Sequence, residues 1–115
     1  MAKSAVKWRC EGCGYIHDGD AVSGACPKCG AAAEKFKKLD DAAADLVERS
    51  RRTNMLHTRV VALAREIEVL CNEGIEDNLD PGCVDVFRKS LARSYEMMKL
   101  SMTEQAGHMS KGKWG

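Results

Sequence analysis

Four of the six cysteines in this 115-residue chain fall into two Cys-x-x-Cys pairs. The pairs are Cys10 with Cys13 and Cys26 with Cys29, and twelve residues separate them. Two residues between ligands allow one tight turn to present both sulfurs to a metal ion, and two such turns complete a tetrahedron of thiolates. In a chain without a recognisable export signal, this pattern is more typical of a metal site than of a disulfide scaffold. The spacing therefore predicts one metal ion bound by these four cysteines.

A glycine follows the second cysteine of each pair, at Gly14 and Gly30. Glycine readily adopts the positive φ that turns backbone N–H groups toward the sulfurs. Hydrogen bonds from those N–H groups stabilise the anionic thiolate and tune the reduction potential of a bound metal. We therefore expect both glycines to belong to the site.

The residues around the cysteines resemble a known family. Residues 8–17 read WRCEGCGYIH, residues 26–31 read CPKCGA, and Phe36 follows. These segments resemble the two knuckles and the core phenylalanine of the rubredoxin family, in particular the short rubredoxin domain of the rubrerythrins. The resemblance covers about residues 7–38. It implies a three-stranded antiparallel sheet around one iron ion that exchanges one electron between its ferric and ferrous states.

The identity of the metal is the main open choice. A four-cysteine site accepts iron or zinc, because both ions bind thiolates in tetrahedral geometry. Tyr15 and the rubrerythrin-like surroundings favour one iron ion per chain, and zinc is the alternative. Trp8, Tyr15 and Phe36 are expected to form a small apolar core. So small a domain cannot be stabilised by burial alone, so we expect folding to require the metal.

The composition changes near Leu39, and the remainder predicts an antiparallel helical hairpin with helices at about 41–72 and 81–105. Asn72 or Gly74 is expected to end the first helix, and the tail from His108 is expected to be loose. The predicted fold class is therefore small α+β. A metal-binding domain with a three-stranded antiparallel sheet at 1–39 precedes a long α-helical hairpin at 40–115.

An apolar series with heptad spacing runs along the first predicted helix. Its members are Leu56, Val60, Leu63, Ile67 and Leu70. The second helix carries an apolar face at Val84, Phe87, Leu91, Tyr95, Met98 and Met102. A hairpin alone leaves much of this surface in water, and exposed apolar patches usually mark partner surfaces. We therefore expect a homo-oligomer built through the hairpin, a four-helix bundle, or docking onto a larger subunit.

The bulk properties exclude several classes of function. A net charge of +1 argues against a protein that binds nucleic acid through bulk charge. No apolar run reaches the roughly 18 residues of a membrane span, and the missing export signal favours the cytoplasm. The residues three before His17, His57 and His108 are not glutamates. The Glu-x-x-His motifs of a rubrerythrin di-iron site are therefore absent, and we assign no catalytic residue.

Three functions remain, in decreasing order of preference. The first is a rubredoxin-like electron carrier that exchanges electrons with a redox partner protein. The second is a structural zinc-ribbon interaction module, in which the metal serves folding alone. The third is an enzyme with a thiol pair formed by Cys71 and Cys83, which would lie near the hairpin loop. Packing of these two cysteines as small apolar residues is the simpler interpretation.

Overall fold

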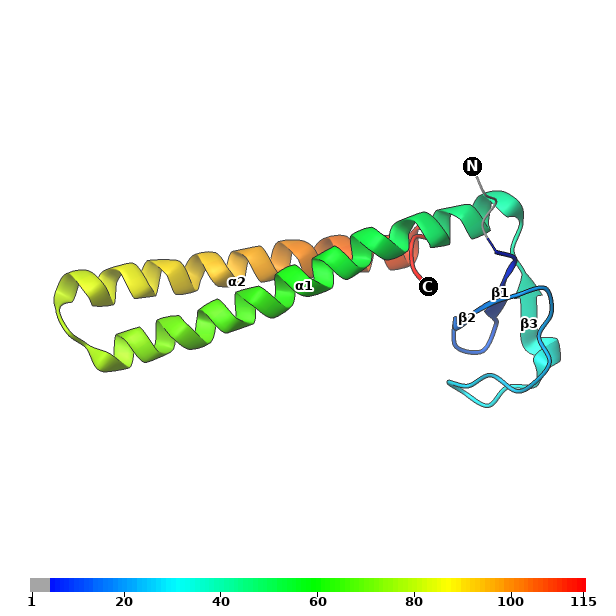
Figure 1. Ribbon diagram of the computed structural model, residues 1–115, viewed down its shortest axis with the longest axis horizontal. Coiled ribbons are helices and arrows are strands. Elements are labelled where there is room, and N and C mark those ends of the chain that lie inside the picture. Colours follow the sequence, from blue (N-terminus) through cyan, green and yellow to red (C-terminus); the bar gives the residue numbers. More distant parts are fainter. Residues whose placement is uncertain (1–4) are drawn as a thin grey trace. The chain divides into compact units, whose positions relative to one another are not determined.

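The computed structural model describes residues 5–115, and it confirms the predicted α+β class (Figure 1). The elements in chain order are β1 (Lys7–Cys10), β2 (Ile16–Asp18), the 3-10 helix η1 (Ala33–Lys35), β3 (Phe36–Lys38), α1 (Asp41–Asp77) and α2 (Pro81–Ser110). The chain forms two compact units. The described residues up to Arg52 form the first with Lys111–Gly115, and Thr53–Ser110 form the second. The first unit thus includes the opening turns of α1, and a domain boundary at residue 39 stays a prediction.

The sheet has the strand order β2-β1-β3, and both pairings are antiparallel. Cys10, at the end of β1, pairs with Phe36 of β3, so this cysteine lies next to the core phenylalanine. The buried core consists of Cys10, Cys26 and Phe36, with Trp8 packed against it. Tyr15 differs from the expectation. Its ring contacts the Phe36 ring edge to face but remains 38% exposed, because it lies at the margin of this very small core.

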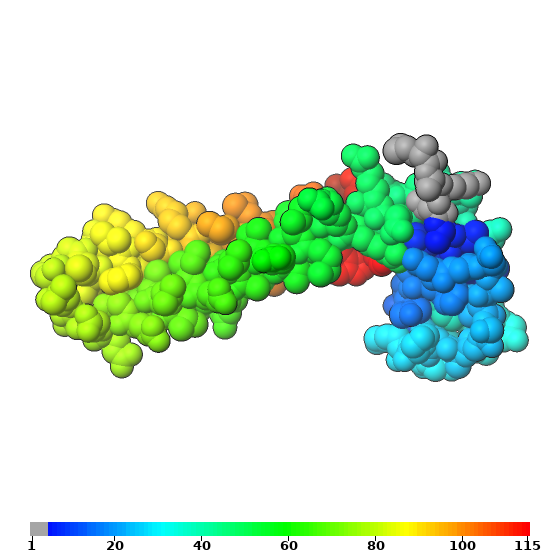
Figure 2. Space-filling view, viewed as in Figure 1, coloured from blue at the N-terminus to red at the C-terminus, as the bar shows by residue number. Residues whose placement is uncertain are grey.

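In the second unit α1 and α2 lie side by side, and their surfaces meet along the hairpin (Figures 1 and 2). Several hydrogen bonds between the helices fix their register, among them the two that follow. Ser94 donates to the carbonyl of Ala64, and His57 Nδ1 lies 3.0 Å from Ser101 Oγ. We call the buried residues between the helices the seam. They are Asn54, Ala64 and Cys71 of α1 with Ser94, Ser101 and His108 of α2.

Much of the apolar surface that was expected to remain in water lies beside the seam. Leu56, Leu63 and Leu70 are each about half exposed or more. On α2, Tyr95 and Met102 are exposed, whereas Ser94 and Ser101, one position earlier, are buried. The leucine series of α1 is therefore exposed, as expected, whereas Phe87 of the apolar face on α2 packs against Gly74 of α1. Small side chains allow two helices to approach closely, so they occupy the contact in preference to leucine.

Both helices are longer than the sequence predicted. α1 continues through Gly74 to Asp77, because Gly74 lies against the ring of Phe87 and serves close packing rather than helix termination. α2 begins at Pro81 as expected but continues to Ser110. The prediction of a loose tail from His108 is wrong. The His108 side chain is buried, and its Nδ1 lies 2.6 Å from Asn54 Oδ1.

The contact of Gly74 predicts an unusual response to alanine. A methyl group at this position would overlap the Phe87 ring. Gly74→Ala should lower the free energy of unfolding of the hairpin by about 1–3 kcal/mol, although alanine is the better helix former. Urea unfolding followed by circular dichroism measures the change. The control is Gly107→Ala in α2, where a methyl group meets nothing within 4 Å. This control should stabilise the helix slightly, and equal effects of both variants would contradict the packing role.

Within the described part of the chain, neither helix combines the length and the apolar character that crossing a membrane requires.

Candidate metal centre

Two turns of the same construction carry the four cysteines. In each turn, the first cysteine donates its N–H to the carbonyl five residues later. The glycine four residues after that cysteine donates back to its carbonyl. The bonds are Cys10 N to Tyr15 O at 2.9 Å, Gly14 N to Cys10 O at 2.8 Å, Cys26 N to Ala31 O at 2.8 Å and Gly30 N to Cys26 O at 2.9 Å. Gly14 and Gly30 have φ angles of 87° and 76°, so their predicted conformation is confirmed.

The structure brings all four predicted cysteines together. Their sulfurs all lie within 4.8 Å of one another. The Cys10 and Cys29 sulfurs are 3.7 Å apart, and those of Cys13 and Cys26 are 3.6 Å apart. A tetrahedral ion about 2.3 Å from each sulfur needs sulfurs about 3.8 Å apart, so the cavity between them fits one such ion. Over residues 5–115, no other set of three or more His, Cys, Asp or Glu side chains comes as close.

Backbone N–H groups point at the sulfurs, as the glycine positions predicted. Burial raises the pKa of the Cys26 thiol, but hydrogen bonds from the N–H groups of Cys29 and Lys28 bring this pKa down to about 7. A hydrogen bond from the N–H of Tyr15 likewise lowers the pKa of the Cys13 thiol. There, desolvation and hydrogen bonds with the other thiols raise the pKa to about 12. The same N–H groups would stabilise thiolates bound to a metal ion.

The four ligands differ in their exposure to solvent. Cys10 and Cys26, the first cysteine of each pair, are buried in the core. Cys13 and Cys29, the second of each pair, are exposed. One side of the site is therefore covered by protein, and the other side opens directly onto the surface.

Sequence reasoning missed a charged network in the first unit. The side chain of Lys7 is fully buried, and its Nζ lies 3.0 Å from Asp18 Oδ2 and 3.8 Å from Glu48 Oε1. Arg51 donates two hydrogen bonds to Asp18, at 2.6 and 2.9 Å, and one to Glu48 at 3.1 Å. Hydrogen bonds from Arg51 and then from Lys7 lower the pKa of Asp18 to about 2. No local sequence pattern marks such a network.

The other candidate pair, Cys71 and Cys83, is not brought together. Gly74 of α1 lies against Phe87 of α2, so these two residues are at the same height along the hairpin. Cys71 lies three residues farther from the loop than Gly74, and Cys83 lies four residues closer to the loop than Phe87. The two cysteines are therefore about 10 Å apart along the hairpin. Cys71 is buried in the seam. A hydrogen bond with Asp80 raises the pKa of Cys83, which makes its thiol less reactive. Nothing in this arrangement supports a redox-active thiol pair.

Comparison with known proteins identifies the first part of the chain. The family described as rubrerythrin, rubredoxin-like domain, matches residues 8–37, which include the sheet and both cysteine turns. Residues 8–37 form a rubredoxin-like domain of the rubrerythrin type. This confirms the resemblance that the residues around the two cysteine pairs predicted. The rubredoxin-like domain thus contains all four clustered cysteines of the metal-binding site.

Two relatives extend this comparison. Rubrerythrin from Nitratidesulfovibrio vulgaris is 38% identical over 39 residues, which cover 34% of this chain and 20% of that protein. Reverse rubrerythrin-1 from Clostridium acetobutylicum is 30% identical over 115 residues, which cover 91% of this chain and 59% of that protein. The chain therefore spans less than two thirds of either relative. The second similarity extends into the helices, beyond the resemblance at about residues 7–38. No solved structure matches the chain.

Proposed function

We propose that the protein is a one-electron carrier that holds one iron ion through Cys10, Cys13, Cys26 and Cys29. The rubredoxin-like domain at residues 8–37 is the observation that carries this proposal. The spacing of the four sulfurs supports it, because it suits a tetrahedral ion. When bound, iron in four thiolates supplies reversible exchange of one electron between the ferric and ferrous states.

The residues of the site suit this role. Backbone hydrogen bonds hold both cysteine turns, so the ligands need to move little when the charge at the centre changes. The buried sulfurs of Cys10 and Cys26 anchor the site in the core, whereas those of Cys13 and Cys29 are exposed. The exposed pair offers a short path to a redox partner protein. The helical hairpin would then serve self-association or docking onto that partner.

A cytoplasmic location completes the proposal, because a reducing compartment keeps metal-binding cysteines free of disulfides. The alternative is a structural zinc ribbon, in which the hairpin is the functional surface. The tetrahedral spacing of the sulfurs favours this alternative as much as it favours iron, since zinc takes the same geometry. The two proposals differ in metal content and in colour.

Metal analysis with a visible spectrum separates them. Protein purified from cells supplied with both metals should contain about one iron per chain, absorb in the visible range and bleach with a mild reductant. Cys26→Ser should abolish the colour, whereas the matched change Cys71→Ser at the buried cysteine of the hairpin should leave it intact. A colourless protein with stoichiometric zinc would overturn the electron-carrier proposal and favour the structural ribbon.

A further inference from the structure

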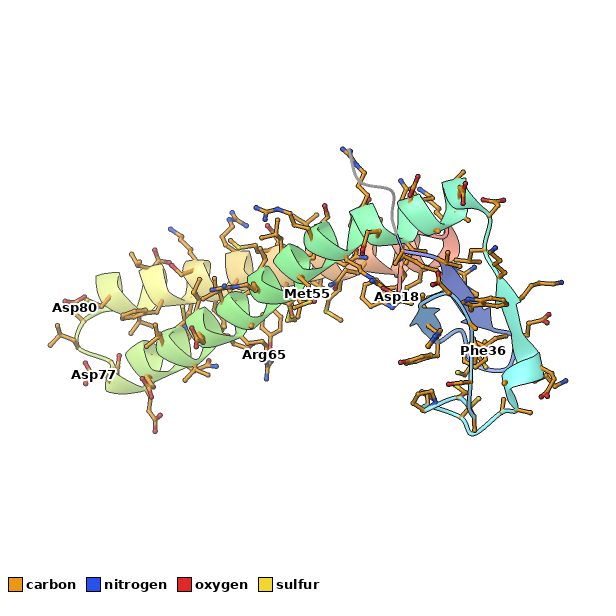
Figure 3. All side chains as sticks on the ribbon, turned by 45° about the vertical axis from the view of Figure 1, so that its right-hand side comes forward. Asp18, Phe36, Met55, Arg65, Asp77 and Asp80 are labelled. Carbon is orange, nitrogen blue, oxygen red and sulfur yellow. The ribbon has the colours of Figure 1, made fainter. Side chains whose placement is uncertain are left out.

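Exposed apolar residues form a face along one side of the hairpin, and no other described residue of the hairpin covers them. Its exposed members each stand one position before a residue that faces the other helix. They are Leu56, Leu63, Ile67 and Leu70 on α1 and Val86, Met97 and Leu100 on α2. Because the helices are antiparallel, the positions that precede the seam on each helix turn toward the same side of the hairpin. Side chains project outward along both helices (Figure 3). We call this set the apolar face.

The apolar face is symmetric about one level of the hairpin. On α1, Leu56 and Leu70 each lie seven residues from Leu63. On α2, Val86 and Leu100 each lie seven residues from Arg93. The hydrogen bond from Ser94 to the carbonyl of Ala64 puts these two centres at the same level. A two-fold rotation about a line that lies over the face and runs across both helices at this level would therefore bring apolar residues of a second copy opposite apolar residues of the first.

The charges that border the face on α1 are complementary under the same rotation. Arg59 and Glu66 occupy the same heptad position on either side of the centre, and both are exposed. Arg52 and Glu73 continue the series at seven-residue intervals, so the basic half of the helix precedes the acidic half. The rotation that places Leu63 over Leu63 of a second copy brings Arg59 toward Glu66 of that copy.

The border of the apolar face on α2 also has a basic residue before the centre and an acidic residue after it. Lys89 and Glu96 are seven residues apart and lie on either side of the centre. Arg93 is the one charged residue at the centre of the face among the described residues. Its guanidinium lies 3.2 Å from Glu96 of its own helix, and this pairing offsets the repulsion between the two Arg93 side chains that would meet at the axis.

We propose that a second copy of this chain covers the apolar face. The two-fold axis lies between the two copies, over the apolar face, and runs across both helices at the level of Leu63 and Arg93, so each helix packs antiparallel on its own equivalent and the two hairpins complete a four-helix bundle. This proposal rests on the proposed function, in which the hairpin serves self-association, and it specifies the surface and the arrangement of the two copies. Charge complementarity sets the register, and the burial of leucine side chains supplies the stabilisation.

Sedimentation velocity of the full metal-loaded chain tests the proposal at micromolar concentration. The unmodified protein should be a dimer. Leu63→Glu puts two carboxylates at the axis and should give a monomer, while the fold survives because Leu63 is already half exposed. Val69→Glu is the matched control, since Val69 is equally exposed and follows the seam rather than preceding it. A monomeric unmodified protein, or dissociation by Val69→Glu with Leu63→Glu still dimeric, would overturn the proposal.

A charge swap tests the register without disturbing the apolar residues. Arg59→Glu should weaken dimerisation about five- to twentyfold, because it places like charges opposite each other twice in the dimer. Adding Glu66→Arg to the same chain should restore the original affinity. Failure of the double variant to recover would contradict this two-fold arrangement. The colour and metal content of the same samples report separately on the electron-carrier proposal.

Discussion

Removal of the bound metal should unfold the sheet and both cysteine turns while the hairpin stays helical. The buried core of the first unit around the sheet consists of Cys10, Cys26 and Phe36, and two of these three are metal ligands. Structural four-ligand zinc sites contribute roughly 10–16 kcal/mol of apparent binding energy, far more than this core can supply by burial. The hairpin is stabilised by its own contacts, such as His108 with Asn54, and does not depend on the metal.

A chelator titration measures this effect. Amide resonances of β1, β2 and β3 should collapse to random-coil positions, whereas helical circular dichroism should change little. Cys26→Ala should reproduce the collapse without chelator, and Cys83→Ala should not, since Cys83 lies at the start of α2. Persistence of the strand resonances in metal-free protein would show that the apolar core suffices for folding.

The second large effect concerns the buried lysine. Among the described residues, Asp18→Ala leaves the fully buried Lys7 ammonium with Glu48, 3.8 Å away, as its remaining carboxylate partner. Loss of the closer partner should lower the free energy of unfolding of the first unit by about 2–3 kcal/mol. This value is below the usual cost of breaking a buried ion pair, because about a third of the Asp18 side chain is exposed. Urea unfolding of the metal-loaded protein at pH 7 measures it. Asp20→Ala is the matched control, because Asp20 is an exposed carboxylate two residues away.

The same interaction predicts a pH dependence. Folding lowers the pKa of Asp18 from 3.8 to about 2, because Arg51 and Lys7 stabilise its carboxylate. The stabilisation is therefore complete above about pH 4 and is lost as the pH falls toward 2. The metal site also weakens in acid, so the relevant quantity is the stability difference between the unmodified protein and Asp18→Asn. A difference that stays constant from pH 6 down to pH 3 would contradict the assigned pKa.

The parts that sequence reasoning predicted well depend on local patterns. The cysteine spacing, Gly14 and Gly30 determine two turns whose hydrogen bonds span only five residues, so neighbouring residues contain most of the information. The two helices follow from their heptad period and from Asp80-Pro81, whose aspartate accepts a hydrogen bond from the N–H of Cys83.

The parts that were missed depend on contacts between distant segments. Gly74 usually signals a helix end, but here it makes room for a ring thirteen residues away along the chain. The Lys7 network joins a strand to a helix 41 residues later, and a lysine beside a strand gives no sign of burial. The residues of the seam were not predicted, because the period locates an apolar face, whereas side-chain size decides which face meets the neighbouring helix. Each miss therefore has a tertiary cause.

A redox titration of the iron-loaded protein tests the central claim most directly. With the visible absorption followed against potential, we expect one reversible transition that fits a one-electron process, with iron retained through repeated cycles. Cys13→Ser should shift the midpoint, because it replaces one exposed sulfur ligand with oxygen, whereas Cys83→Ser should not. An irreversible change, or loss of iron on reduction, would contradict an electron carrier and leave the four cysteines with a structural role.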